Sequence, residues 1–127
     1  MVKKFLLLSF SSMALAVLLN ACYYDTAEKL YPTNALQNCD TTSVTYSKTI
    51  QPILANECLS CHRSTILQGN VNLEGYSNVA IWAKSGKLYN SVAHNGQASP
   101  MPKNGSKLSD CKILQIKKWI DAGSPNN

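Results

Sequence analysis

The apolar residues of this chain follow two different patterns before and after residue 40. Residues 5–19 are almost all apolar, interrupted only by serines, and they follow the basic pair Lys3 and Lys4. This run is too short to span a bilayer comfortably and has the composition of an export signal peptide. Residues 23–40 show no sustained apolar period, so we expect a linker there.

Beyond residue 40 the apolar positions recur at helical spacing, and no segment alternates as a strand would. The first helix is predicted at 46–56, where four apolar side chains share one face. Thr45 or Ser47 could cap this helix. Pro52 lies inside it and should either kink the helix or mark a late start.

Three further helices are predicted in the second half of the chain. Two are short, at 78–84 after a possible cap at Ser77 and at 88–93. A loop rich in Gly, Pro, Asn and Ser follows. The last helix has Ser109 as its N-cap and Gly123 at its C-terminal end. These patterns predict a small all-α domain of three to five short helices.

One motif carries recognisable chemistry. Residues 58–62 read CLSCH, the C-x-x-C-H pattern through which a c-type haem is attached. Cys58 and Cys61 would form thioether bonds to one haem, and His62 would be an axial iron ligand. A thioredoxin-like redox pair would need a strand–helix–strand context, a zinc site would need two more ligands, and a disulfide across so short a loop would be strained.

The end of the apolar run carries a second signal. Residues 19–22 read LNAC and resemble the lipobox of bacterial lipoproteins, in which the cysteine becomes the lipid-modified N-terminus. Ordinary signal cleavage, which would leave Cys22 as a stray thiol, is the alternative. Several acyl chains on Cys22 would satisfy the need for more than one lipid signal. We therefore predict a signal peptide at 1–21, a lipid-anchored linker at 22–40 and a single-haem domain at 41–127.

The predicted export has consequences for localisation and for the remaining cysteines. The domain is expected in the periplasm or cell envelope, anchored to a bacterial membrane. Cys39 and Cys111 are an even pair in an oxidising compartment, so we predict a disulfide between them, with two free buried thiols as the alternative. Because the loop it closes is long, the chain-entropy model assigns it roughly 4 kcal/mol or more.

The charge of the chain does not indicate a nucleic-acid partner. The formal net charge of +5 falls to +3 when Lys3 and Lys4 leave with the signal peptide. Two haem propionates would bring the domain close to neutral. Arg63 is the single arginine, and no basic cluster is present.

The residue opposite His62 would decide the chemistry of a bound haem. Met101 is the only methionine outside the predicted signal peptide, and Pro100 and Pro102 restrict the backbone around it. A Met/His pair is the ligand set of electron-transfer cytochromes c. His94 is the alternative distal ligand, and it could instead hydrogen-bond a propionate or end its helix.

The segment 46–127 resembles small monohaem cytochrome c domains of the class I type, in the version found in bacterial lipoproteins. The resemblance is carried by YSKTIQPIL at 46–54, CLSCH at 58–62, MP at 101–102, KLSD at 107–110 and WIDAGSPN at 119–126. It implies a cytochrome c-like fold whose first and last helices cross near the haem edge, and Met101 as distal ligand. By residue type, Leu73, Tyr76 and Trp82 are candidates to line the haem or the core.

The resemblance also implies electron transfer rather than substrate turnover, so we expect an electron carrier that docks weakly with redox partner proteins and is not an enzyme. A haem-based peroxidase or gas sensor is the alternative, with Met101 labile or absent from the iron and His94 as acid–base group. A lipoprotein without haem, serving as a metal-binding or scaffolding module, is the third possibility.

Overall fold

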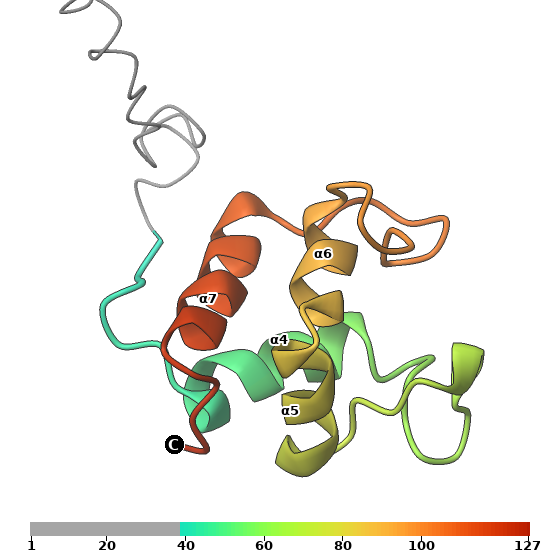
Figure 1. Ribbon diagram of the computed structural model, residues 1–127, viewed down its shortest axis with the longest axis horizontal. Coiled ribbons are helices and arrows are strands. Elements are labelled where there is room, and N and C mark those ends of the chain that lie inside the picture. Colours follow the sequence, from blue (N-terminus) through green and yellow to red (C-terminus); the bar gives the residue numbers. More distant parts are fainter. Residues whose placement is uncertain (1–38) are drawn as a thin grey trace, which may run out of the picture. The chain divides into compact units, whose positions relative to one another are not determined.

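The computed structural model describes residues 39–127 (Figure 1). The predicted signal peptide, the lipidation site Cys22 and the predicted linker as far as residue 38 lie outside these residues. Within 39–127 the chain forms four α-helices and no strand, which confirms the all-α class. The elements are η1 (Tyr46–Ile50), α4 (Gln51–Glu57), η2 (Gln68–Asn70), α5 (Tyr76–Lys84), α6 (Lys87–Ala93) and α7 (Asp110–Asp121). No helix in this range is both long and apolar enough to cross a bilayer.

Pro52 divides the first predicted helix into two parts. Residues 46–50 form the π-helical turn η1, in which the N–H of Ile50 donates to the carbonyl of Thr45. Pro52 then lies in the first turn of α4, where a missing N–H costs least. Of the two possible caps, Thr45 is used, because its side chain accepts a hydrogen bond from the N–H of Lys48.

The C-terminal tail packs back against the first helical turn. The carboxamide oxygen of Asn127 accepts the N–H of Tyr46 at 2.8 Å, so the tail satisfies a donor that a helix start leaves unpaired. The indole N–H of Trp119 donates to the carbonyl of Pro125 at 2.9 Å. Trp119 is fully buried and its ring lies 5.7 Å from that of Tyr46. The two ends of the described fold therefore stabilise each other.

Helices α5 and α6 begin after glycines rather than after a capping serine. The prediction that Ser77 caps α5 is wrong: the helix starts at Tyr76, after Gly75 at φ 81°. Gly86, at φ 75°, lies between the two helices and lets the chain turn. Such positive φ angles are the conformations that only glycine adopts without steric cost.

Helix α7 matches its prediction. The hydroxyl of Ser109 accepts the N–H of Lys112, and the helix ends two residues before Gly123, which has a φ of 89°. The helix packs against both η1 and α6, while α5 packs against α6. The most deeply buried side chains of the resulting core include Ile50, Leu54, Val79, Ile113, Ile116 and Trp119.

The predicted Cys39–Cys111 disulfide is present, with the two Cα atoms 5.4 Å apart. Cys111 lies in the first turn of α7, so the bond fastens the segment that precedes η1 to this helix. The side-chain amide of Gln115 adds a hydrogen bond to the carbonyl of Asp40 at 2.9 Å. Both contacts fix the start of the described chain on α7.

Candidate functional site

The CLSCH motif forms a compact turn directly after α4. The N–H groups of Cys61 and His62 both donate to the carbonyl of Cys58, at 3.1 and 3.0 Å. The carbonyl of His62 accepts the N–H of Leu73 at 2.8 Å. The motif is thus fixed at both ends by main-chain hydrogen bonds, and its two thiols and its imidazole arise from one short stretch of backbone.

A cavity of about 880 Å³ lies against this turn, a size within the range of cofactor sites. Cys58, Cys61 and His62 line it together with Met101, which belongs to the loop between α6 and α7. The cavity therefore brings together all four residues predicted to hold a haem. Much of the remaining lining is apolar: Val71, Leu73, Trp82, Leu88, Val92 and Leu108.

Of the three additional lining candidates, Leu73 and Trp82 reach the cavity and Tyr76 does not. The Tyr76 hydroxyl donates to the carbonyl of Ser124 at 2.9 Å. Its ring meets that of Tyr46 edge to face at 5.2 Å. Tyr76 therefore connects α5 to the C-terminal tail and has a role in the core.

Cys58 and Cys61 are not bonded to each other, so the strained short disulfide is absent. Burial raises the pKa of the Cys58 thiol to about 11, with smaller contributions from the negative charges of Glu57 and Cys61. A redox-active C-x-x-C pair needs a thiol whose pKa is lowered, so the environment of Cys58 argues against thioredoxin-like chemistry.

The third alternative to haem attachment, a zinc site, also lacks its ligands. The only other cysteines within 39–127 are Cys39 and Cys111, and the disulfide occupies both. In this part of the chain no group of three or more His, Cys, Asp or Glu side chains is arranged to hold a metal ion. Four thiolate or imidazole ligands, the usual set of a structural zinc site, are therefore not assembled around Cys58 and Cys61.

His62 has a ring nitrogen with no structural partner. Its Nδ1 atom is buried and makes no hydrogen bond within the described chain. Buried polar atoms are normally paired, so this nitrogen is an exception, while His62 as a residue lines the cavity. Two thiols, an imidazole, a thioether and a largely apolar wall fit the chemistry of a covalently attached haem.

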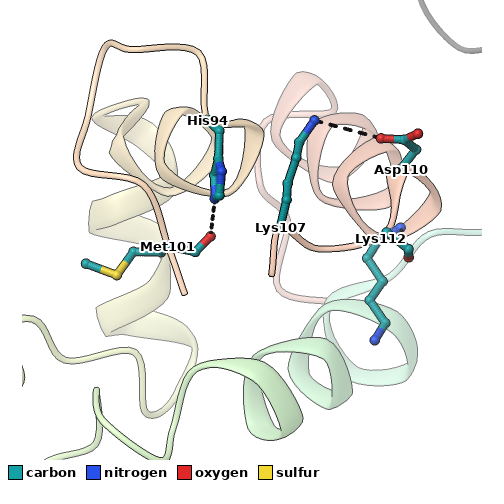
Figure 2. Close-up of polar contacts among 6 residues, drawn as sticks. His94, Met101, Lys107, Asp110 and Lys112 are labelled. Atoms are coloured by element: carbon teal, nitrogen blue, oxygen red, sulfur yellow. Dashed lines mark hydrogen bonds and ion pairs between the residues drawn. The ribbon is translucent and has the colours of Figure 1, made fainter. Parts of the chain in front are cut away.

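Met101 is held by the end of α6. Its N–H donates to the carbonyl of Ser91 at 3.1 Å, and its own carbonyl lies 2.8 Å from Nε2 of His94. Figure 2 shows the His94 ring aimed at this main-chain oxygen, with the thioether extending away from the ring. His94 does not line the cavity, whereas Met101 does.

The cavity also has charged residues in its wall. Its one carboxylate, Glu57, is paired with Lys112 of α7 at 2.5 Å. Lys87 and Lys103 line the cavity without a carboxylate partner in the described range, and the ammonium of Lys87 lies 5.6 Å from the centre of the Trp82 ring. The wall is therefore net positive and suited to a group that carries carboxylates.

Several lining residues were not predicted from the sequence. Leu88 and Val92 stand one helical turn apart on α6, a spacing that marks a buried face but does not reveal what the face meets. Lys87 and Lys103 carry no sequence signal that separates them from other surface lysines. The partners of Met101 are also invisible in the sequence, since they depend on how the loop folds back onto α6.

Comparison of the chain with protein-family profiles, with curated protein sequences and with solved structures found no match.

Proposed function

We propose that this protein is a monohaem c-type cytochrome with a cytochrome c-like fold, which carries electrons outside the cytoplasm while lipid-anchored through Cys22. The observation that carries the proposal is the position of Met101. Its loop and the Cys58–His62 turn are distant in sequence, yet both line the same cavity of about 880 Å³. An imidazole and a thioether from distant parts of the sequence are thereby both available in the wall of one cavity.

Each residue of the site has a distinct role in this proposal. Cys58 and Cys61 would bond a haem to the turn after α4, and His62 and Met101 would bind its iron. When bound, haem supplies a one-electron iron couple whose potential a Met ligand raises. With both His62 and Met101 bound to the iron, no position would be left there for a substrate.

The cavity wall supports the same role. Its apolar side chains, among them Leu88 and Val92, would give a bound haem apolar surroundings, and the dielectric around an iron centre influences its potential. Lys87 and Lys103 offer ammonium groups to the two propionates. Redox partner proteins would then meet the domain through the small, weak interfaces typical of electron transfer.

The position of His94 favours an electron carrier over a haem peroxidase or gas sensor. In those alternatives His94 would act beside an open iron position. Its Nε2 is instead engaged by the main chain of Met101, and its side chain does not line the cavity. For an acid–base role, His94 would have to break its contact with Met101 and turn its side chain into the cavity.

The optical spectrum tests this proposal. The full chain is produced in a bacterial host that attaches c-type haem, and spectra are recorded in both oxidation states. We expect low-spin bands of reduced covalent haem and the weak far-red band of sulfur bound to ferric iron. Met101→Ala should abolish the far-red band and allow CO to bind the reduced protein.

Ile81→Ala is a matched control, because Ile81 is 65% exposed on α5 and does not line the cavity. This variant should keep the wild-type spectrum. Rapid CO binding by the unaltered protein would favour the peroxidase or sensor alternative. A protein without covalent haem would contradict the proposal.

A further inference from the structure

The loop that presents Met101 has few attachments to the rest of the fold. Residues 99–100 and 103–107 are exposed, so little packing restrains the chain on either side of Met101. Among the described hydrogen bonds, only two connect residues 98–106 to another segment, and both end on the main chain of Met101. These two bonds therefore connect the main chain of Met101 to the rest of the fold.

Both bonds come from the C-terminal end of α6. The carbonyl of Ser91 is one of the groups that the last turn of a helix leaves without an intrahelical partner, and it accepts the N–H of Met101. His94 is the C-cap of the same helix. Leu88 and Val92 of the same helix are buried at 5% and 2% exposure, so the helix end is a firm attachment point.

The acceptor determines which His94 nitrogen carries the proton. A carbonyl oxygen can only accept a hydrogen bond, so Nε2 must carry a hydrogen to make the 2.8 Å contact with the oxygen of Met101. The contact is therefore directional, and an unprotonated Nε2 could not make it.

The backbone of His94 differs from that of the helix it ends. His94 has a φ of 55° and lies in the left-handed region, a conformation that histidine, asparagine and aspartate adopt more often than other residues with side chains. From this C-cap position its ring reaches the carbonyl of Met101.

We propose that His94 is a positioning residue, which does not bind iron itself but holds the main chain of Met101 so that Met101 stays in the cavity wall, where its thioether could bind the iron. The inference rests on the proposed function, because its test measures the binding of Met101 to a haem iron. It assigns to His94 a role that differs from a distal ligand and from an acid–base group.

Three variants of the full haem-loaded chain test the inference. His94→Phe keeps a planar ring but removes the donor. His94→Gln keeps an N–H donor of similar reach. Asn70→Phe is the matched control, because Asn70 has a φ of 58°, is exposed and does not line the cavity. The readouts are the far-red sulfur–iron band and the dissociation constant of added imidazole, which competes with Met101 for ferric iron.

We expect His94→Phe to weaken the far-red band and to lower the imidazole dissociation constant about three- to tenfold, the factor that one hydrogen bond of ordinary net strength supplies. His94→Gln should restore most of this loss, and Asn70→Phe should match the wild type. An unchanged imidazole affinity in His94→Phe would overturn the inference, as would an equal effect of Asn70→Phe.

The same series separates failure of this inference from failure of the proposed function. If the wild type has the far-red band and Met101→Ala removes it, the proposed function stands whatever the His94 variants do. If the wild type lacks the band and His94→Phe loses the low-spin spectrum, His94 is the iron ligand and the positioning role is wrong.

A measurement without substitution covers the case in which a variant fails to fold. The chain has two histidines, so nitrogen-15 labelling of histidine in the reduced protein gives two imidazoles to assign. We expect His94 to carry its proton on Nε2 and, when the Met101 carbonyl is labelled with carbon-13, to show coupling of Nε2 to that carbon through the hydrogen bond. A proton on Nδ1 alone would contradict the inference.

Discussion

Replacing both Cys39 and Cys111 with serine removes the bond that fastens the start of the described chain to α7. The two cysteines are separated by 72 residues in sequence. In the chain-entropy model, closing a loop of this length destabilises the unfolded state by about 4 kcal/mol at 25 °C. The native state also loses its restraint on Asp40, whose carbonyl accepts a hydrogen bond from Gln115.

This magnitude is large for a small domain. A change of about 1 kcal/mol shifts the melting temperature of a domain of 60–100 residues by roughly 4–8 °C, so the double variant should melt about 15 °C lower or more. Far-UV circular dichroism of the oxidised haem-loaded protein measures this shift, and urea unfolding gives the free energy.

Ser43→Ala is the matched control for the disulfide prediction, because Ser43 is exposed and belongs to the same segment before η1. It should change the free energy of unfolding by less than about 0.5 kcal/mol. A double cysteine variant that unfolds within about 1 kcal/mol of the wild type would refute the loop-closure reasoning for this protein.

Three further predictions concern the core, the helix end and the cavity wall. Burial raises the pKa of Tyr46 above its ordinary value of 10.0, so the neutral phenol is favoured in the fold. The free energy of unfolding should therefore fall as the pH rises beyond about 10 towards the pKa of the folded state. Urea titrations of Tyr46→Phe should show a shallower fall. Gly123→Ala should lower the free energy of unfolding by about 1 kcal/mol, because the φ of 89° is strained for alanine although open space surrounds the added methyl group. Gly123→Asn should lower it less, and equal losses in the two variants would contradict a purely conformational origin. Glu57→Gln should lower the free energy of unfolding by about 1 kcal/mol or less, since both side chains of the Glu57–Lys112 ion pair are partly exposed. The difference from the wild type should shrink in 1 M salt, and an effect independent of salt would argue against an ionic origin.

Local signals predicted α7 well. Ile113, Ile116 and Trp119 lie on one face at helical spacing and are buried at 1%, 0% and 0% exposure. Ser109 also caps α7 as expected. The C-x-x-C-H pattern is also a local signal, and haem attachment at Cys58 and Cys61 stays a prediction.

Features that depend on tertiary structure were missed. The prediction for α5 placed a cap at Ser77 because serine is a good N-cap, but the turn at Gly75 starts the helix earlier. Tyr76 was a candidate lining residue by type, yet the C-terminal tail engages its hydroxyl through Ser124. The bond between His94 and Met101 joins a helix end to a loop, and no periodicity encodes such a contact.

The most direct test of the central claim is the mass of one peptide from the full chain produced in a host that attaches c-type haem. Trypsin cleaves after Lys48 and Arg63 and releases residues 49–63, which contain both cysteines of the motif. The account predicts that this peptide carries the added mass of one haem and has no thiol left to alkylate. Recovery of the peptide at its unmodified mass, with Cys58 and Cys61 both open to alkylation, would contradict it.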